Sequence, residues 1–225
     1  MLIGGLQRSS LVDYPGHISA VVFMQGCNFR CPYCHNPQLV DPARFGQPLD
    51  VDEVFRFLQS RVGRLQAVVV SGGEPLLHDD LPELLTRIRR LGYLVKLDTN
   101  GSFPDRLSAI VSAGLVDFIA MDIKAPFGRY GELAGVPVDI GAIRKSIRII
   151  RESGADYLFR TTLAEPLLDE EDIRKSREFL GPTEHYLVQP INPAAEWLRP
   201  EARTGVRAHS EADLPAGCGR KRQQR

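Results

Sequence analysis

Residues 18–35, ISAVVFMQGCNFRCPYCH, join a predicted strand to a loop that carries three cysteines. The first eight residues are apolar and rich in β-branched side chains, which is typical of a strand buried in a sheet. Gly26 ends this pattern, and Cys27, Cys31 and Cys34 follow within eight residues. Because ligands of α/β folds bind at the carboxyl ends of strands, this loop is the first candidate for a functional site.

Strand and helix patterns alternate along the rest of the chain. Five more strands are predicted, over residues 66–71, 93–98, 116–123, 156–163 and 185–189. Amphipathic helices are predicted between them, over residues 51–62, 81–91, 104–113, 140–153 and 169–180. Such alternation is the pattern of βαβ units, so we predict an α/β fold with a parallel sheet. The pattern leaves open whether the sheet is doubly wound or curls toward a barrel.

The domain organisation follows from where this alternation stops. No linker interrupts residues 18–190, and we predict one domain over residues 1–200. Residues 201–225 lack periodicity and carry six Lys or Arg against three Asp or Glu, so we expect a divergent, disordered basic tail. Cys218 lies in this tail and is predicted to be a bystander.

Composition excludes several classes of protein. The chain has 225 residues, with 28 basic and 28 acidic side chains, and this balance argues against a dedicated nucleic-acid-binding protein. No apolar run approaches the roughly 20 residues of a membrane helix. The first residues lack the basic and apolar regions of a signal peptide. We therefore expect a cytoplasmic protein with neither membrane nor nucleic acid as partner.

The spacing of the three clustered cysteines points to metal chemistry. In a reducing compartment, clustered cysteines are more often metal ligands or catalytic thiols than disulfide partners. Iron–sulfur clusters are normally held by four thiolates, so three thiolates on a 4Fe–4S cluster would leave one iron open. The alternative is a structural zinc site completed by His35 or Cys218, although such sites favour two separated ligand pairs. We predict the cluster.

Polar residues also follow the other predicted strands. Gly72 and Gly73 come after the second strand, and their lack of side chains lets the backbone approach a ligand closely. Asp122 and Lys124 lie on the same side of an extended chain. The remaining strand ends carry 98–101 (DTNG), 160–162 (RTT) and 189–192 (QPIN). The sequence therefore predicts one site at the carboxyl edge of the sheet.

The order of these motifs resembles that of the radical S-adenosylmethionine (radical SAM) superfamily, in which Cys-x3-Cys-x2-Cys precedes Gly-Gly-Glu-Pro. More narrowly, residues 5–40, GLQRSSLVDYPGHISAVVFMQGCNFRCPYCHNPQLV, are similar to the anaerobic ribonucleoside-triphosphate reductase activating proteins. The pyruvate formate-lyase activating enzymes are related to this family. The resemblance covers residues 3 to 198.

This resemblance implies a partial (β/α)6 barrel of the TIM type. It implies that Cys27, Cys31 and Cys34 hold a 4Fe–4S cluster whose open iron binds S-adenosylmethionine. Reductive cleavage of that cofactor would yield a 5′-deoxyadenosyl radical. The radical would remove hydrogen from a glycine of the partner enzyme, anaerobic ribonucleotide reductase. Flavodoxin or ferredoxin is the expected electron donor.

The resemblance also assigns individual residues. The cofactor would lie against Tyr33, His35, Gly72, Gly73, Glu74, Asp98, Asn100, Asp122, Lys124 and Asn192. The carbonyls of the two glycines would accept hydrogen bonds from the methionine ammonium, and Lys124 would pair with the methionine carboxylate. Asp98, Thr99 and Asp122 are expected to bind a monovalent cation. Asn192 departs from the histidine of the pyruvate formate-lyase activating enzymes.

Three alternatives stay open at this point. The partner could be another glycyl-radical enzyme, or the substrate could be a small molecule. The alternative of a different class is a zinc-binding module without catalysis. Metal content separates the last from the others, since a cluster brings about four irons and four sulfides and a zinc site brings one zinc.

Overall fold

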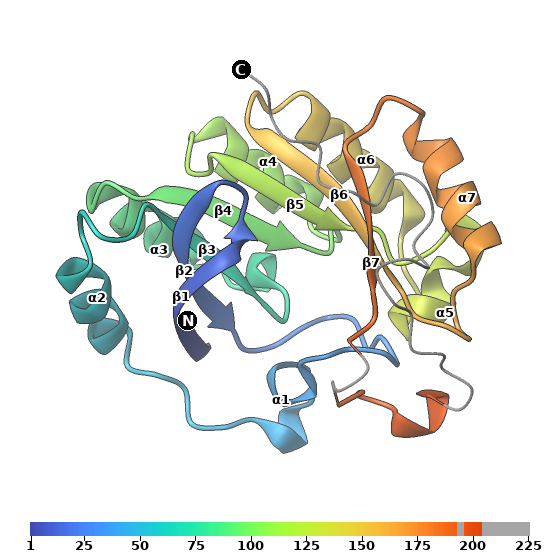
Figure 1. Cartoon of the computed structure of the whole chain (residues 1–225), viewed down its shortest axis with the longest axis horizontal. Helices are drawn as coiled ribbons and strands as arrows, with labels where there is room; N and C mark the ends of the chain where they lie inside the picture. The colour runs from blue at the N-terminus through green and yellow to red at the C-terminus, as the bar shows by residue number, and fades with distance from the viewer. Residues whose placement is uncertain (193–195, 204–225) are drawn as a thin grey trace.

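The computed structural model describes residues 1–192 and 196–203. A sheet of seven strands organises the molecule, with neighbouring strands in the order of the sequence from β1 to β7 (Figure 1). Six of these strands run parallel and correspond to the six predicted ones: β2 (His17–Met24), β3 (Ala67–Gly72), β4 (Leu94–Thr99), β5 (Phe118–Asp122), β6 (Asp156–Leu163) and β7 (Tyr186–Pro190). The predicted α/β class is confirmed.

The five predicted helices are all present, with ends within two residues of the prediction. They are α2 (Val51–Ser60), α3 (Leu81–Arg90), α4 (Pro104–Ser112), α6 (Ile140–Arg151) and α7 (Glu170–Leu180). Two short helices, α1 (Pro37–Val40) and α5 (Tyr130–Ala134), were not predicted. Four 3-10 turns complete the described elements: η1 (Pro42–Arg44), η2 (Pro75–Leu77), η3 (Phe127–Arg129) and η4 (Pro200–Arg203).

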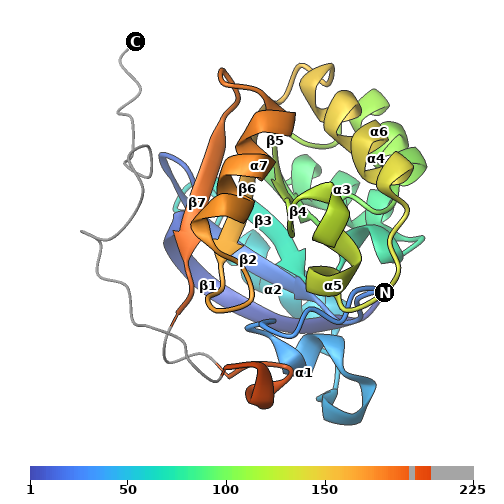
Figure 2. The same ribbon diagram turned by 90° about the vertical axis from the view of Figure 1, so that its right-hand side faces the viewer.

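The strand order settles the choice between an open sheet and a barrel. A doubly wound sheet reverses direction at a switch point, so its strand order departs from the sequence order. Here the order is sequential, and right-handed crossovers then place the helices that connect the parallel strands on one face of the sheet. Figure 2 shows helices α3 to α7 along the outside of the curled strands. Because β1 and β7 remain as two edges, the architecture is a partial TIM-type barrel.

Alternate residues of each strand supply two apolar layers. On β3, Val68 and Val70 pack in the large cluster that contains buried helix residues such as Leu85. Val69 points to the opposite, inner face and packs in a smaller cluster with Phe118. The inner face holds less apolar surface, which leaves room for polar groups inside the curl.

Strand β1 (Ile3–Tyr14) was missed by the sequence analysis. It runs antiparallel to β2 through a tight turn at Gly16, whose φ of 78° is in the left-handed region that favours glycine. Its sequence, IGGLQRSSLVDY, has neither a continuous apolar run nor strict alternation. Register shifts interrupt its pairing with β2 and remove the two-residue period that would predict a strand.

The carboxyl-terminal predictions are only partly covered by the described residues. Turn η4 crosses the predicted domain boundary at residue 200. Most of the predicted tail, including Cys218, lies outside the described residues. None of the helices in the described ranges has the length and apolar character needed to cross a bilayer.

Candidate active site

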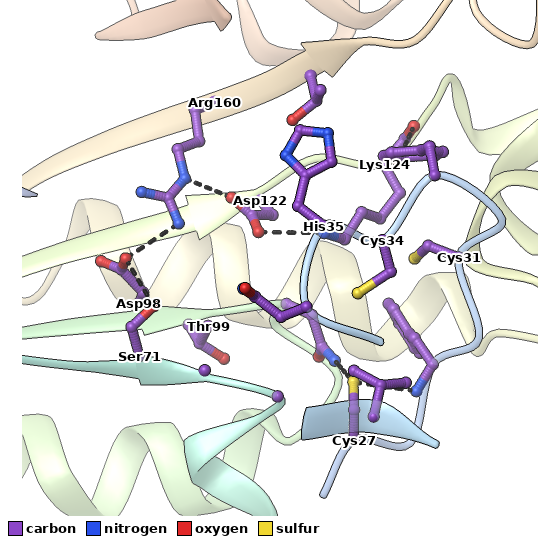
Figure 3. Close-up of a pocket in the computed structure, with 18 of the residues that line it drawn as sticks. Cys27, Cys31, Cys34, His35, Ser71, Asp98, Thr99, Asp122, Lys124 and Arg160 are labelled. Atoms are coloured by element: carbon purple, nitrogen blue, oxygen red, sulfur yellow. Dashed lines mark hydrogen bonds and ion pairs between the residues drawn. The ribbon is translucent and has the colours of Figure 1, made fainter. Parts of the chain in front are cut away.

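A cavity of about 220 Å³ lies at the carboxyl ends of the strands (Figure 3). Twelve of the fourteen predicted site residues line it: Cys27, Cys31, Tyr33, Cys34, His35, Gly72, Gly73, Asp98, Thr99, Asn100, Asp122 and Lys124. They come from the cysteine loop after β2 and from the ends of β3, β4 and β5. Residues far apart in the sequence therefore meet at the edge where the parallel pattern places strand ends.

Two predicted residues, Glu74 and Asn192, do not line this cavity. The Glu74 side chain is fully buried beneath it and accepts hydrogen bonds from Thr99 Oγ1 at 2.8 Å and from the Asn100 backbone N–H at 2.7 Å. A third hydrogen bond comes from the backbone N–H of Leu76 at 3.0 Å. Glu74 therefore ties the loop after β3 to the loop after β4.

Gly72, the last residue of β3, and Gly73, which follows it, allow neighbouring backbone segments to pack closely. Gly72 has a φ of 115°, and a Cβ on Gly73 would lie 1.9 Å from the carbonyl oxygen of Gly26. The same Gly26 oxygen accepts a hydrogen bond from the Glu74 backbone N–H at 2.8 Å. Glycine at position 73 thus lets the β3 loop pass directly against the start of the cysteine loop.

The three cysteine thiols lie in a buried environment. Burial raises the pKa of Cys27 to about 12 and that of Cys31 to about 11, and it also raises the pKa of Cys34. Metal ligation requires thiolates. Cys31 is buried, and Cys27 and Cys34 are partly buried. Three such thiols that resist ionisation on their own are suited to a cationic centre that stabilises their deprotonated form.

The arrangement of the thiols also bears on the kind of centre. Among the described residues, no three His, Cys, Asp or Glu side chains converge as the ligands of a single ion. Three cysteine thiols on one loop are the donor type of an iron–sulfur cluster, in which each thiolate binds a different iron. The donor set fits a cluster, and Cys27, Cys31 and Cys34 are the residues that would hold it.

A ladder of paired charges, which we call the charged wall, faces the cysteine loop across the cavity (Figure 3). Arg160 lies between two carboxylates, donating from Nε to Asp122 Oδ1 at 2.5 Å and from Nη2 to Asp98 Oδ2 at 3.1 Å. Lys124 Nζ donates to Asp122 Oδ2 at 3.0 Å, and Lys96 Nζ donates to Asp98 Oδ1 at 2.6 Å. The wall alternates in sign along its length and carries three cations and two anions.

These contacts set the charge states of the wall. Burial alone would raise the pKa of Asp122, but Arg160 and Lys124 outweigh it and hold this pKa well below its usual range. The pKa of Asp98 is lowered in the same way, with Arg160 and Lys96 opposing the effect of burial. Burial would lower the pKa of Lys124, yet Asp122 raises it well above normal. All three groups are therefore ionised near neutral pH.

The predicted monovalent-cation residues are brought close together but have other partners. The carboxylates of Asp98 and Asp122 already share the guanidinium of Arg160. The Thr99 hydroxyl donates to Glu74. The binding of a monovalent cation by these residues stays a prediction.

Tyr33 and His35 flank Cys34, the last of the three clustered cysteines. Tyr33 is buried, and its hydroxyl donates to the Lys124 carbonyl at 3.5 Å. His35 lies within the cavity, where burial and the nearby Lys124 lower its pKa and keep it neutral. Its buried Nε2 atom has no hydrogen-bond partner among the described residues. A buried polar atom without a partner is costly, so His35 is suited to a hydrogen bond with a bound ligand.

The sequence analysis missed two members of the site. Lys96 is buried inside the curl of the sheet, and Ser71 Oγ donates to Asp98 Oδ2 at 3.0 Å. Lys96 is two residues before Asp98 on β4 and thus shares its face, a signal that was present in the sequence. Arg160, Thr162 and Gln189 also line the cavity, at strand ends whose polar character was noticed but given no definite role.

Comparisons with known proteins identify the family of the chain. Residues 21–180 match the family described as "Radical SAM superfamily". The fold is similar to that of Streptococcus suis SuiB, with a TM-score of 0.61 and 16% identity, over 79% of this chain and 40% of that chain. At this identity the likeness concerns the fold alone.

Curated relatives are more specific. The Methanocaldococcus jannaschii protein named "Putative glycyl-radical enzyme activating enzyme MJ1227" is 34% identical over 85% of this chain and 80% of its own length. A "7-carboxy-7-deazaguanine synthase" of Methanopyrus kandleri is 35% identical over 50% of this chain and 52% of its own length. A Listeria monocytogenes "Pyruvate formate-lyase-activating enzyme" is 33% identical over 54% of this chain and 52% of its own length. The chain belongs to the radical SAM superfamily and, within it, to the glycyl-radical enzyme activating enzymes.

Proposed function

We propose that this chain is an oxidoreductase that uses S-adenosylmethionine to generate a glycyl radical on an anaerobic ribonucleotide reductase. The observation that carries the proposal is that three cysteine thiols and the charged wall meet at one cavity of a partial barrel. The wide coverage of MJ1227, which spans most of both chains, supports an activating enzyme over other radical SAM chemistries. When bound, the cluster and S-adenosylmethionine supply the one-electron chemistry that removes a hydrogen atom from a glycine Cα.

The chain's own residues bind and orient these groups. Cys27, Cys31 and Cys34 would hold the cluster. Lys124 is a fixed cation near the thiols, and it is suited to the methionine carboxylate because its ion pair with Asp122 holds its ammonium in place. His35, with its unpartnered Nε2, is suited to a hydrogen bond with the nucleoside.

The open side of the barrel suits a protein substrate. Strands β1 and β7 are the two edges of the sheet, and they do not close on each other in the described chain. A loop of a partner protein could complete the enclosure and exclude water from the reacting groups. We propose flavodoxin or ferredoxin as the electron donor, because the chemistry requires a one-electron reductant.

An anaerobic electron paramagnetic resonance experiment tests the proposal. The reconstituted, reduced protein is mixed with S-adenosylmethionine and the anaerobic ribonucleotide reductase of the same host. A glycine-centred doublet on the reductase is expected. A reduced-cluster signal that shifts with S-adenosylmethionine but yields no doublet would retain the cluster and discard this partner.

A small-molecule substrate is the second candidate, because the Methanopyrus kandleri synthase matches about half of this chain at similar identity. It predicts that 5′-deoxyadenosine forms only with the small molecule and that no radical appears on any protein. Zinc at one equivalent per chain, with no iron–sulfur absorption, would overturn both candidates.

A further inference from the structure

A segment close to the end of the described chain lies against the cysteine loop. Residues 196–203, which we call the strap, include turn η4 and lie at the same end of the molecule as α1 (Figures 1 and 2). The backbone N–H of Arg199 donates to the carbonyl of Pro32 at 3.0 Å. Glu196 forms an ion pair with Arg44 at 2.6 Å. Two contacts therefore join the strap to the loop and to the turn that follows α1.

Trp197 anchors the strap in the core. Its side chain is only 1% exposed, and it belongs to the main apolar cluster. It is also the sole tryptophan of the chain. Its indole Nε1 is buried without a hydrogen-bond partner among the described residues, so apolar packing holds this side chain in place. A large side chain buried this fully fixes the position of the neighbouring residues.

The contact at Pro32 falls between two of the cluster ligands, Cys31 and Cys34. The earlier half of the loop is held by the barrel itself, since the Arg30 N–H donates to the Ala134 carbonyl at 2.8 Å. Asn28 adds a hydrogen bond to Ser102 at 2.9 Å. The later half of the loop has an internal hydrogen bond, from the Cys34 N–H to the Cys31 carbonyl at 3.0 Å, and one barrel contact through the Tyr33 hydroxyl. The strap adds the hydrogen bond to Pro32, which lies between the two cysteines.

We propose that the strap is a positioning element for the cluster: by holding Pro32 it fixes the separation of Cys31 and Cys34 and slows loss of iron. This inference rests on the proposed function, because it requires a cluster on the three cysteines. It assigns a role in the loaded enzyme to Trp197 and to the backbone of Arg199.

The backbone nature of the contact permits a matched pair of variants. Arg199→Pro removes the donating N–H, whereas Arg199→Ala removes only an exposed side chain and keeps the N–H. Each protein is reconstituted with iron and sulfide, and a ferrous chelator is added anaerobically. We expect iron release about fivefold faster from Arg199→Pro, the effect of one lost hydrogen bond. Release from Arg199→Ala should match that of the unmodified protein.

Tryptophan fluorescence gives a second readout that does not require a variant. If the strap lies against the cluster loop, assembly of the absorbing cluster should quench the emission of Trp197, and chelation should restore it. Emission that does not change on cluster assembly would overturn the inference even if Arg199→Pro fails to fold. Circular dichroism of the iron-free variants identifies a folding failure.

The possible failures are distinguishable. If the unmodified protein assembles no iron–sulfur cluster, the proposed function fails and the strap inference fails with it. If the cluster assembles and Arg199→Pro, folded normally, releases iron at the unmodified rate, the strap inference alone fails.

Discussion

The two sides of the cavity differ in whether their polar groups have partners within the chain. On the charged wall, the carboxylates of Asp98 and Asp122 each contact two cationic side chains. The opposite side is the cysteine loop with Cys27, Cys31 and Cys34, which we call the cysteine wall. Desolvation raises the pKa values of its three thiols, and His35 has a buried nitrogen without a hydrogen-bond partner among the described residues. The carboxylates of the charged wall are paired with cations of the chain itself, whereas the cysteine wall is suited to binding a group that the chain does not supply.

The two walls also differ in what fixes their geometry before a ligand binds. The charged wall is built on strand ends β4, β5 and β6, so its geometry is set by the sheet. The cysteine wall is a loop, and a metal centre bound to its thiols would stabilise it. Damage to the cysteine wall should therefore appear in metal content, and damage to the charged wall should appear in the stability of the metal-free protein.

The largest effect is expected from the cysteines. Cys31→Ser should lower iron content to near zero and radical formation by more than about 100-fold, because a neutral hydroxyl is a poor iron ligand. Its metal-free unfolding free energy should change little, since the two side chains have similar volumes. Iron assay and urea unfolding measure the two quantities. Cys218→Ala is the control and should retain both iron and activity.

Arg160→Gln should have the next largest effect. It leaves the buried Asp98 and the partly buried Asp122 with one lysine each, and breaking a buried ion pair such as that of Asp98 costs about 3 kcal/mol. Urea unfolding of the metal-free protein should show this loss, and Arg160→Lys should recover part of it. An unfolding free energy unchanged in Arg160→Gln would mean that the wall does not depend on its central cation.

The parallel strands could be predicted from the sequence because each one is marked by a pattern of residues within a short stretch of chain. Strands β2 to β7 are short runs of apolar, β-branched residues that end at polar or glycine residues, and their carboxyl ends share one edge. The site residues were found by their position at these ends. β1 could not be found in this way, because an irregular antiparallel strand with exposed residues lacks both patterns.

Lys96 and Glu74 show what sequence reasoning could not reach. In the run Leu94 to Asp98, alternation places Lys96 on the same face as Asp98, but the burial of Lys96 depends on the curl of the sheet. The motif around Glu74 marks a loop near the cofactor, but the contact between two loops directs this side chain away from the cavity. In both cases tertiary contacts between distant segments decide the environment of the side chain.

Glu74 ties the loop after β3 to the loop after β4, and its titration should appear in the pH dependence of stability. Burial raises its pKa from 4.5 to about 7, so the folded protein holds one more proton than the unfolded chain between these values. Stability therefore falls as the pH rises through this interval, by about 2 kcal/mol between pH 5 and 8. The difference in unfolding free energy between the unmodified protein and Glu74→Gln should decrease by the same amount from pH 5 to pH 8. A difference in unfolding free energy that does not change with pH would contradict the raised pKa of Glu74.

The smallest effect tests the completeness of the charged wall. Ser71→Ala removes one hydrogen bond from Asp98, which keeps its ion pairs with Lys96 and Arg160. We expect a loss of about 1 kcal/mol in the urea unfolding of the metal-free protein, because the remaining cations still compensate the buried carboxylate. Ser9→Ala, on the exposed part of β1, is the control and should change stability by less than about 0.5 kcal/mol. A loss near that of Arg160→Gln would mean that the wall fails as a unit when any member is removed, so that its groups are mutually dependent and not redundant.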